Sequence, residues 1–412
     1  MAAINEVVVI DAIRTPTGKA GWGGKKQGQL SPISAQSVGA LILDELVGRV
    51  QKKAPQFNPH EIEDIAFGCL SQIGDQGMNL ARMATLASQL PYDAAGWTLN
   101  RYCNAGLQAI NSMAQAIMVG AGDIMIAAGI EMMSRYGMGS DFEVVTAANW
   151  PVELDSRASE RGGFSIMGVC AEIVADMYEL HKEEMDRFGL WSHQKALKAM
   201  EDEKAYKKRV IPINVAGSGK SPIYAKKDES PRPKCLLDPD AAYADIKNLP
   251  PRFRENGKVT AGNSSGIVDG GAGVMLMSAS KAKNLGLKPM VRVRSMAVAG
   301  SDPNVMLLGP IPAMKKALSR ANLTMDDIGV FEPNEAFASP VLAFCKEFGL
   351  AFDDPRINPT GGAIAIGHPI GCSGVLYFTE MLHWMVNNNV KYGLQTLCGG
   401  GGIGIATIVE LV

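Results

Sequence analysis

Residues 98–135 read TLNRYCNAGLQAINSMAQAIMVGAGDIMIAAGIEMMSR, and this stretch decides the fold class. Apolar side chains recur at helical spacing over positions 107–118, glycines at 120 and 122 then end the helix, and 124–128 is a short apolar run typical of a buried strand. A helix that leads directly into a buried strand is typical of proteins in which strands and helices alternate. We therefore expect an α/β fold.

The same alternation continues on both sides of this stretch. A β-branched run at 6–12 precedes an apolar periodic segment at 33–50, and a strand-like run at 65–70 precedes a helical segment at 77–90. From about residue 267 the alternation returns, and the chain closes with a helix and two apolar strands. Each part has a glycine-containing loop, a helix and then an apolar strand, so we expect two duplicated β/α parts.

The middle of the chain, about 135–265, has a different character. It holds a helical stretch near 168–205, a charged run, and a segment rich in Gly, Ser, Pro and Lys at 217–234. This composition indicates a large insertion with exposed loops. The expected units are an N-terminal half at 1–134, an inserted loop domain at 135–266 and a C-terminal half at 267–412.

Composition excludes several classes of protein. Of the 412 residues, 47% are hydrophobic and 20% are charged, which is ordinary for a globular protein with a sizeable core. The formal net charge is −2, so no overall basic field attracts nucleic acid or an anionic membrane. We expect no targeting sequence at the N-terminus, because a strand-like run follows without a charged or long apolar segment before it. No apolar run approaches the roughly 20 residues of a membrane span.

The seven cysteines are scattered without a C-x-x-C pair. Their odd number and spacing disfavour a disulfide framework and a structural zinc site. A reducing compartment fits best, and we expect a cytoplasmic protein with no bound metal.

Cys103 stands immediately before the expected helix at 107–118. At this point backbone N–H groups and the helix dipole lower the pKa of a thiol and favour the thiolate. An isolated cysteine can also be a small buried hydrophobic residue. Cys103 is therefore a candidate nucleophile with a structural alternative.

Two more candidates lie in glycine-rich loops of the C-terminal part. His368 lies in GGAIAIGHPIG, where glycines let the backbone approach a ligand and Pro369 stiffens the loop; a surface turn is the alternative. Cys398 begins CGGGGIGIA between two apolar strands. Four successive glycines each cost about 0.5–1 kcal/mol relative to alanine. Close approach of a substrate explains them better than a plain hairpin turn does.

These residue types together suit acyl transfer through a thiol. A thiolate accepts the acyl group, a histidine takes the thiol proton, and a second thiol moves a proton at carbon. Asn334, after VFEP, is a fourth candidate, with a helix N-cap as its alternative role. Zinc binding by Cys103, Cys398 and His368 lacks the usual short ligand spacings, and the glycine spacing at 362–367 lacks the lysine of a phosphate loop.

The chain resembles the thiolase family over essentially its whole length. The motifs in chain order are VVIDAIRTPTGK near the N-terminus, NRYCNAGLQAI around position 103, GIEMMSR at 129–135, TAGNSSGIVDGGAGV at 260–274, PNEAFA at 333–338, NPTGGAIAIGHPIGCSG at 358–374 and CGGGGIGIATIVE at 398–410. Seven motifs in one order are far more specific than any single motif. The resemblance implies two similar βαβαβαββ halves in a five-layer α-β-α-β-α arrangement, with a loop domain inserted near the end of the first half.

The resemblance also implies catalytic roles for five residues. Cys103 would carry the acyl group, His368 would activate it, and Cys398 would act as acid or base at the α-carbon of the acyl-CoA that leaves or arrives. Asn334 would position a water that forms, with His368, an oxyanion hole for the thioester enolate. Backbone N–H groups of Cys103 and Gly400 would form a second oxyanion hole, and the kinetics would be ping-pong.

Residues of the inserted domain resemble those that bind coenzyme A in the family. Ala261, Ser264 and Ser265 match the segment that lines the pantetheine arm, and Met167 borders the same arm. Ile166 stands where short-chain acetoacetyl-CoA thiolases usually have histidine. An apolar side chain there favours a longer or bulkier acyl chain, since one methylene in a pocket shifts preference by about 1–3 kcal/mol. Coenzyme A is implied as a substrate, with no permanently bound cofactor.

The function expected from this resemblance is that of a 3-ketoacyl-CoA thiolase in fatty-acid or related β-oxidation. Acetyl-CoA acetyltransferase, which makes or cleaves acetoacetyl-CoA, is the nearest alternative. An inactive acyl-CoA or sterol-carrier binding protein is more remote, because it would be expected to lose one of the two cysteines or the histidine. Condensing enzymes of fatty-acid synthesis have no counterpart of the second cysteine loop. Relatives are dimers or tetramers, so we expect a homodimer or homotetramer.

Overall fold

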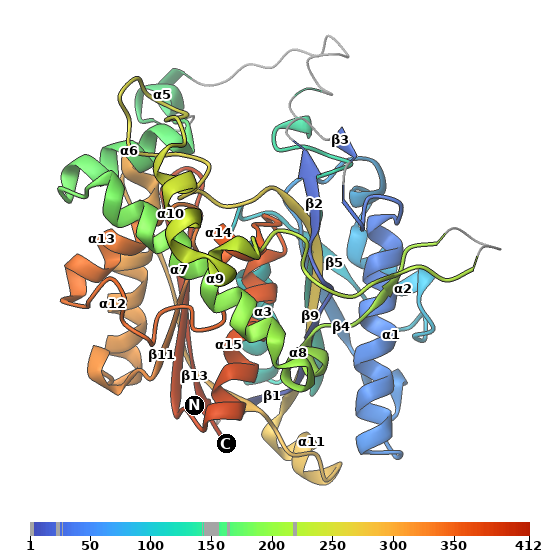
Figure 1. The fold of residues 1–412 in the computed structure, drawn as a ribbon. Coiled ribbons are helices and arrows are strands. Elements are labelled where there is room, and N and C mark those ends of the chain that lie inside the picture. The colour runs from blue at the N-terminus through green and yellow to red at the C-terminus, as the bar shows by residue number, and fades with distance from the viewer. Residues whose placement is uncertain are drawn as a thin grey trace.

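The described residues of the computed structural model form a five-layer α/β fold (Figure 1). The structure describes residues 4–21, 25–26, 28–141, 143, 156–162, 165–216 and 221–412. Two outer helices, a sheet, two central helices, a second sheet and two further outer helices follow one another across the molecule. The α/β class and the five layers expected from the sequence are therefore confirmed.

The first half is a mixed sheet with helices on both faces. Its strands are β1 (Val7–Arg14), β4 (Asp64–Gly68), β5 (Trp97–Leu99), β6 (Ile124–Met132) and β9 (Val268–Ser278), and their order across the sheet is β1-β9-β6-β4-β5. Its helices are α1 (Ala35–Lys53) and α2 (Leu80–Ala87) on the outer face and α3 (Ala105–Met118) on the inner face. Every residue of β1 is buried, because helices cover both faces of the sheet.

The second half repeats this architecture. Its strands are β10 (Val291–Gly300), β11 (Val330–Pro333), β12 (Tyr392–Gly399) and β13 (Ile403–Leu411), in the order β10-β13-β12-β11. Its helices are α12 (Pro310–Ala321) and α13 (Ala338–Phe348) on the outer face and α15 (Ser373–Asn388) on the inner face. A parallel bridge between Phe331 and Ile357 stands where β5 stands in the first half.

The strand pairings match between the halves. In the first half, β9 is antiparallel to both β1 and β6, and β6 is parallel to β4. In the second half, β13 is antiparallel to both β10 and β12, and β12 is parallel to β11. Helices α3 and α15 occupy equivalent places, so the loops before them are equivalent too. Strand β1 also pairs with β10, which joins the sheets of the two halves by hydrogen bonds. The short strands β2 (Gly18–Gly21) and β3 (Lys25–Lys26) extend from β9 and bring the joined strands to 11. The expected duplication is confirmed.

Strand β9 differs from the division expected from the sequence. Residues 267–412 are expected above to form the C-terminal half, but β9 is hydrogen-bonded to β1 on one side and β6 on the other. The apolar alternation resumes at β9 because this strand completes the first sheet after the insertion. By its hydrogen bonds, β9 belongs to the first half.

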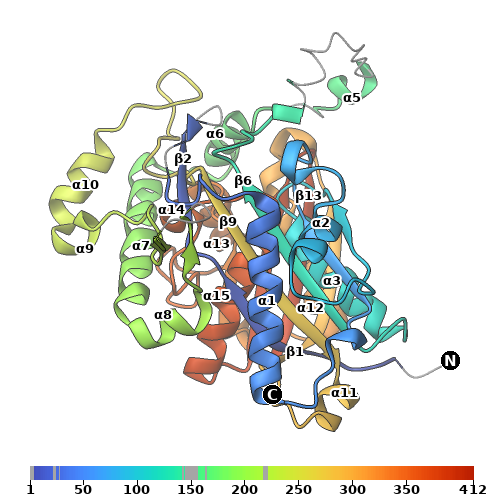
Figure 2. The same ribbon diagram turned by 90° about the vertical axis from the view of Figure 1, so that its right-hand side faces the viewer.

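The chain between β6 and β9 holds a set of helices beside the second half. Its described elements are α5 (Ser156–Glu160), α6 (Met167–Met177), α7 (Lys182–Glu201), α8 (Glu203–Arg209), β7 (Ile213–Asn214), β8 (Tyr224–Ala225), α9 (Lys234–Leu237) and α10 (Pro239–Lys247). The helical stretch expected at 168–205 is broken after α6, where Glu179 adopts a φ of +49°. Figure 2 shows α7 beside α14 (Ala363–Ile366), the short helix just before His368.

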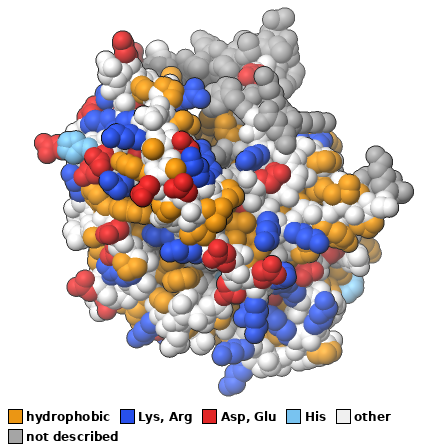
Figure 3. Space-filling model, in the orientation of Figure 1, with side chains coloured by type: hydrophobic (Ala, Val, Ile, Leu, Met, Phe, Trp, Pro, Cys, Tyr) orange, Lys and Arg blue, Asp and Glu red, His pale blue; other side chains and the backbone are white. Residues whose placement is uncertain are grey.

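Short elements complete the described chain. They are β2 (Gly18–Gly21), β3 (Lys25–Lys26), α11 (Ala279–Asn284) and the 3₁₀ helices η1 (Pro59–Glu61), η2 (Gly74–Gln76), η3 (Pro303–Leu308) and η4 (Met325–Asp327). On the face drawn in Figure 3, side chains of both charges are interspersed, in keeping with the net charge of −2. Across the described ranges, no helix has both the length and the apolarity needed to cross a membrane.

Candidate active site

The two central helices touch through the backbone of their first turns. A Cβ on Gly374 would overlap the backbone of α3, and one on Gly106 would lie 2.9 Å from a carbonyl oxygen of the loop before α15. Real Cβ atoms do not approach so closely, so only glycine fits at these two contacts. The contact presses the loop that carries Cys103 against the loop that carries His368.

Cys103 is buried where these loops meet. It precedes Asn104, which is the N-cap of α3, and follows Tyr102, whose φ is +51°. The Cys103 side chain lies in one buried apolar cluster with Met133 and with Ile370, two residues after His368. The expected helix directly after Cys103 is confirmed, and the nucleophile candidate lies beside the histidine loop.

The electrostatics of Cys103 differ from the expectation. Burial raises the pKa of this thiol, and neighbouring Cys398 and Glu131 raise it further, against a smaller opposing effect of the backbone N–H. The lowered pKa expected at a helix start is therefore wrong. Only 3% of Cys103 is exposed, so the loss of water outweighs the helix dipole. The resting thiol is neutral, so a role as nucleophile would need a base to remove its proton.

His368 is buried as a neutral imidazole, the form that can accept a proton. Its Nδ1 lies 2.6 Å from Ser373 Oγ, and the Ser373 hydroxyl donates to the Pro369 carbonyl at 3.1 Å. With the hydroxyl proton used in this way, Nδ1–H donates to Ser373 Oγ and Nε2 keeps a free lone pair. Burial lowers the pKa of His368 to about 4, so the ring is neutral at pH 7. Among the described residues, His368 Nε2 has no hydrogen-bond partner.

Cys398, at the end of β12, is the second thiol of the site. Asn104 links it to the Cys103 loop, because in its satisfied orientation the Asn104 amide nitrogen donates to the carbonyls of Leu397 at 3.1 Å and Cys398 at 2.9 Å. Burial raises the pKa of Cys398 to about 12. This thiol is therefore protonated and able to act as an acid.

The glycines after Cys398 serve two purposes. Gly401 and Gly402 adopt φ angles of +72° and +79° in the turn between β12 and β13, so the hairpin turn accounts for them. A Cβ on Gly400 would lie 3.2 Å from the ring of Tyr102. Gly400 thus brings the turn against the residue that precedes Cys103.

Asn334 follows β11 in the same region. Its backbone N–H donates to the carbonyl of Thr396 at 3.0 Å, two residues before Cys398. Helix α13 begins at Ala338 with Phe337 as its N-cap, so the alternative role of Asn334 as a helix cap is wrong. Both amide atoms of Asn334 are buried, and within the described part of the chain neither has a hydrogen-bond partner. A buried unpaired amide costs free energy, which a polar ligand group would recover.

Residues 264–266 lie between the loop after β11 and the loop before α15. The N–H of Ser265 donates to the carbonyl of Ala336 at 3.0 Å, and the N–H of His368 donates to the carbonyl of Gly266 at 2.8 Å. Ser264 joins the loop after β11 through an isolated β-bridge. The structure therefore brings Ser264 and Ser265 close to His368.

The remaining expected ligands lie in the inserted region. Met167 begins α6 and packs against the core of the second half. Ile166 is the N-cap of α6 and is 64% exposed. Ala261 is also exposed. The ring of Phe253 packs edge-on against Phe337, with centroids 6.0 Å apart. Phe253 was not among the expected residues, because its charged neighbours hide a single aromatic residue in the sequence.

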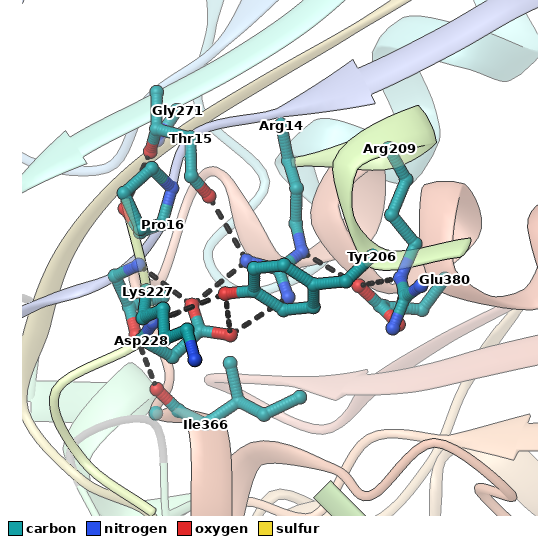
Figure 4. Close-up of polar contacts among 12 residues, drawn as sticks. Arg14, Thr15, Pro16, Tyr206, Arg209, Lys227, Asp228, Gly271, Ile366 and Glu380 are labelled. Atoms are coloured by element: carbon teal, nitrogen blue, oxygen red, sulfur yellow. Dashed lines mark hydrogen bonds and ion pairs between the residues drawn. The ribbon is translucent and has the colours of Figure 1, made fainter. Parts of the chain in front are cut away.

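A buried network of charges joins the inserted region to both halves (Figure 4). Arg14 at the end of β1 pairs with Asp228 at 2.8 Å and with Glu380 of α15 at 2.7 Å. Arg209 of α8 also pairs with Glu380, at 2.8 Å. Although burial alone would raise it, the two guanidinium groups lower the pKa of Glu380 to about 2. No local spacing reveals this network, since Arg14 and Glu380 are 366 residues apart.

The site is suited to covalent acyl transfer with proton movement. It offers two neutral thiols, a neutral imidazole and an unpaired amide, which together can supply a nucleophile, a base and an acid. In the ranges that the structure describes, no group of three or more His, Cys, Asp or Glu side chains is arranged to hold a metal ion.

Comparisons with known proteins agree with this chemistry. A family model for the thiolase N-terminal domain matches residues 7–280, and one for the thiolase C-terminal domain matches residues 287–411. A 3-ketoacyl-CoA thiolase of Marinobacter nauticus is 38% identical over 411 residues, which cover 99% of this chain and 98% of that protein.

Two acetyl-CoA acetyltransferases are also similar over the whole chain. The one from Syntrophomonas wolfei is 39% identical over 417 residues, covering 98% of this chain and 99% of that protein. The crystal structure of the one from Bacillus anthracis matches with a TM-score of 0.86 at 33% identity and covers 100% of both chains. With both family models matched and relatives similar from end to end, this chain belongs to the thiolase family.

Proposed function

We propose that this chain is a 3-ketoacyl-CoA thiolase, an acyltransferase that converts a 3-ketoacyl-CoA and CoA into acetyl-CoA and a shortened acyl-CoA. The observation that carries the proposal is the meeting of the Cys103 and His368 loops, with Cys398 beside Cys103, where the two halves touch. The names of the relatives support the same reaction class.

The first half-reaction transfers the acyl group to the protein. His368 Nε2 takes the Cys103 proton, and Sγ attacks the 3-keto carbon. The bond between the keto carbon and the α-carbon breaks, and the α-carbon of the departing acetyl-CoA takes the proton of Cys398. An acyl-Cys103, a protonated His368 and a Cys398 thiolate remain.

The second half-reaction restores the resting site. The Cys398 thiolate takes the proton of the incoming CoA thiol, whose sulfur attacks the acyl-Cys103 carbonyl. The shortened acyl-CoA leaves, and the Cys103 thiolate recovers its proton from His368. Because one product leaves before CoA reacts, the kinetics are ping-pong.

Polar groups around the thiols stabilise the charge that develops on oxygen. The unpaired Asn334 amide supports its role, with His368, at the thioester enolate. The position of Gly400 against the turn before Cys103 supports a pair of backbone N–H donors from Cys103 and Gly400 at the tetrahedral intermediate.

The inserted region binds the CoA arm in this proposal. We assign residues 135–266 as the loop domain, with Met167, Ala261, Ser264 and Ser265 along the pantetheine arm and Ile166 beside the acyl group. The hydrogen bonds that place Ser265 and Gly266 next to the histidine loop support this assignment most directly. CoA is a substrate rather than a resident cofactor, and the protein is a cytoplasmic homodimer or homotetramer.

Acetyl-CoA acetyltransferase is the second candidate. Two of the similar proteins carry that name, one of them a solved structure. Ile166 is exposed, which limits its contact with a buried acyl group. Thiolysis rates on substrates of different acyl chain length therefore decide between the two candidates.

Thiolysis rates with CoA and a series of 3-ketoacyl-CoAs test the proposal. A 3-ketoacyl-CoA thiolase is expected to give a higher kcat/KM on substrates longer than the four-carbon acetoacetyl-CoA. Activity on the four-carbon substrate alone would favour the acetyltransferase. No thiolysis at any chain length, with folded protein, would contradict both candidates.

A further inference from the structure

Glu131 is a buried carboxylate between the loop after β4 and the histidine loop. It lies on β6, is fully shielded from solvent, and accepts hydrogen bonds from the backbone N–H groups of Leu70 at 2.8 Å and Ser71 at 3.1 Å. Gln76 Nε2 donates to it at 3.1 Å, and the N–H of Gly371 donates to it at 2.9 Å. One carboxylate thus joins the loop after β4, in the first half, to the histidine loop of the second half.

The contact at Gly371 leaves no free space. A Cβ on Gly371 would lie 2.6 Å from the Cα of Cys69 and 2.8 Å from Glu131 Oε2. Glycine is therefore needed for the histidine loop to seat on the carboxylate and on the loop after β4. Such a fit is expected where the position of a backbone must be held within a fraction of an ångström.

Gly371 closes the turn that carries His368. This turn begins at His368, and its third residue, Ile370, lies in one buried apolar cluster with Cys103 and Met133. Glu131 is also near enough to Cys103 to influence its thiol. A shift of Gly371 would therefore change the distance between the histidine ring and the thiol.

We propose that Glu131 is a positioning residue for proton transfer from Cys103 to His368, because its carboxylate ties the turn at 368–371 to the loop after β4 and so fixes where the histidine lies relative to the thiol. The inference rests on the proposed roles of Cys103 and His368. Glu131 touches neither the substrate nor the transferred proton and acts through the backbone of the histidine loop.

The rate at which iodoacetamide alkylates Cys103 at neutral pH tests this proposal. Alkylation needs the thiolate, so it reports the removal of the proton by His368. Intact mass and peptide mapping follow the reaction in the natural protein, in Glu131→Gln, in His368→Ala and in the double variant. Gln is close to Glu in size but lacks its second acceptor oxygen.

Glu131→Gln is expected to slow alkylation by about 10- to 100-fold, the effect of a misplacement of about 1 Å. In the His368→Ala background the same change is expected to alter the rate less than about twofold, because Glu131 acts through His368. In steady-state thiolysis, kcat falls by the same factor as alkylation while KM for CoA stays within about threefold.

Three results overturn the inference: an unchanged alkylation rate in Glu131→Gln, an equal slowing with and without His368, or a faster reaction from removal of the negative charge. A different result overturns the proposed function. If His368→Ala alone leaves the rate unchanged, His368 is not the base.

Glu332→Gln is the matched control. Glu332 is another buried carboxylate, on β11, and its Oε2 has no hydrogen-bond partner among the described residues. Its replacement is expected to leave alkylation unchanged, and an equal slowing would contradict the inference. If Glu131→Gln does not fold, Glu131→Asp keeps the charge but is one methylene too short to reach both loops. It is expected to show the same dependence on His368, and a normal rate would contradict the proposal.

Discussion

The loops before α3 and before α15 occupy equivalent places in the two halves, yet they are held in different ways. The turn that carries Cys103 is formed by hydrogen bonds between its own residues, since the N–H of Tyr102 donates to Asn100 Oδ1 at 2.8 Å and the N–H of Asn104 donates to the Arg101 carbonyl at 3.1 Å. A tight turn and a helix start set the place of the thiol.

The His368 loop is held by side chains from elsewhere in the chain. Thr17 Oγ1 donates to the Ile366 carbonyl at 2.8 Å, Glu131 accepts from Gly371 at 2.9 Å, and Glu335 accepts from the N–H of Ile364 at 3.1 Å. The comparison teaches that the turn that carries the nucleophile is formed by local hydrogen bonds, whereas the turn that carries the base is held by side chains from distant parts of the chain. Changes far from His368 should therefore alter its action, whereas the thiol should respond mainly to changes in its own loop.

Replacement of the nucleophile has the largest expected effect. Cys103→Ala removes the atom that carries the acyl group, so kcat for thiolysis should fall by at least about 10⁴-fold, as for other covalent nucleophiles. Cys235→Ala, at a buried cysteine of the inserted region, is the control and should keep kcat within about twofold. Retained turnover in Cys103→Ala would place the acyl group on another residue.

Replacement of the second thiol should separate the two steps. Cys398→Ala removes the proton donor to the α-carbon, and the loss of a general acid–base lowers kcat by about 10²- to 10⁴-fold. Cys103 should still react with iodoacetamide at a near-normal rate, because His368 remains. Unchanged thiolysis would rule out an acid–base role for Cys398.

The contact between the helices should be sensitive to a single methyl group. Gly374→Ala forces a Cβ into the backbone of α3, and such overpacking destabilises a protein by about 1–3 kcal/mol. Gly48→Ala is the matched control, because nothing lies within 4 Å of its Cβ and it is within α1. That change should raise stability by up to about 1 kcal/mol. Urea unfolding measures both, and equal stabilities would mean that the loops are not pressed together as described.

The pH dependence of kcat/KM should show the smallest effect, and that effect reports on His368. Burial lowers the pKa of His368 to about 4, so the ring stays neutral, and able to accept a proton, until the pH falls to that value. The acid limb of kcat/KM should lie near pH 4 and fall about tenfold per pH unit below it. An acid limb near pH 6.5, the ordinary value for histidine, would show that the ring is solvated in the working enzyme.

Local pattern predicted much of the fold. The helical periodicity at 107–118 and the apolar run at 124–128 became α3 and β6, and the glycine loops with Cys103, His368 and Cys398 came together. These features depend on neighbours in the sequence, and the order of motifs added the duplicated halves.

The remaining features depend on contacts between distant residues. The pKa of Cys103 rises because tertiary packing buries the thiol, which its place before a helix does not reveal. Strand β9 belongs to the first sheet because of its partners β1 and β6. The hydrogen bond from the Gly371 N–H to Glu131 joins residues 240 positions apart, so no spacing in the sequence could predict it.

Mass analysis of the protein mixed with a 3-ketoacyl-CoA, without free CoA, tests the central claim most directly. If the loops of the two halves meet to form one acyl-transfer site, Cys103 should gain the shortened acyl group, acetyl-CoA should be released in equal amount, and added CoA should remove the adduct. The adduct should be absent in His368→Ala on the same timescale. An acyl group on another residue, or acetyl-CoA released without any adduct, would contradict the account.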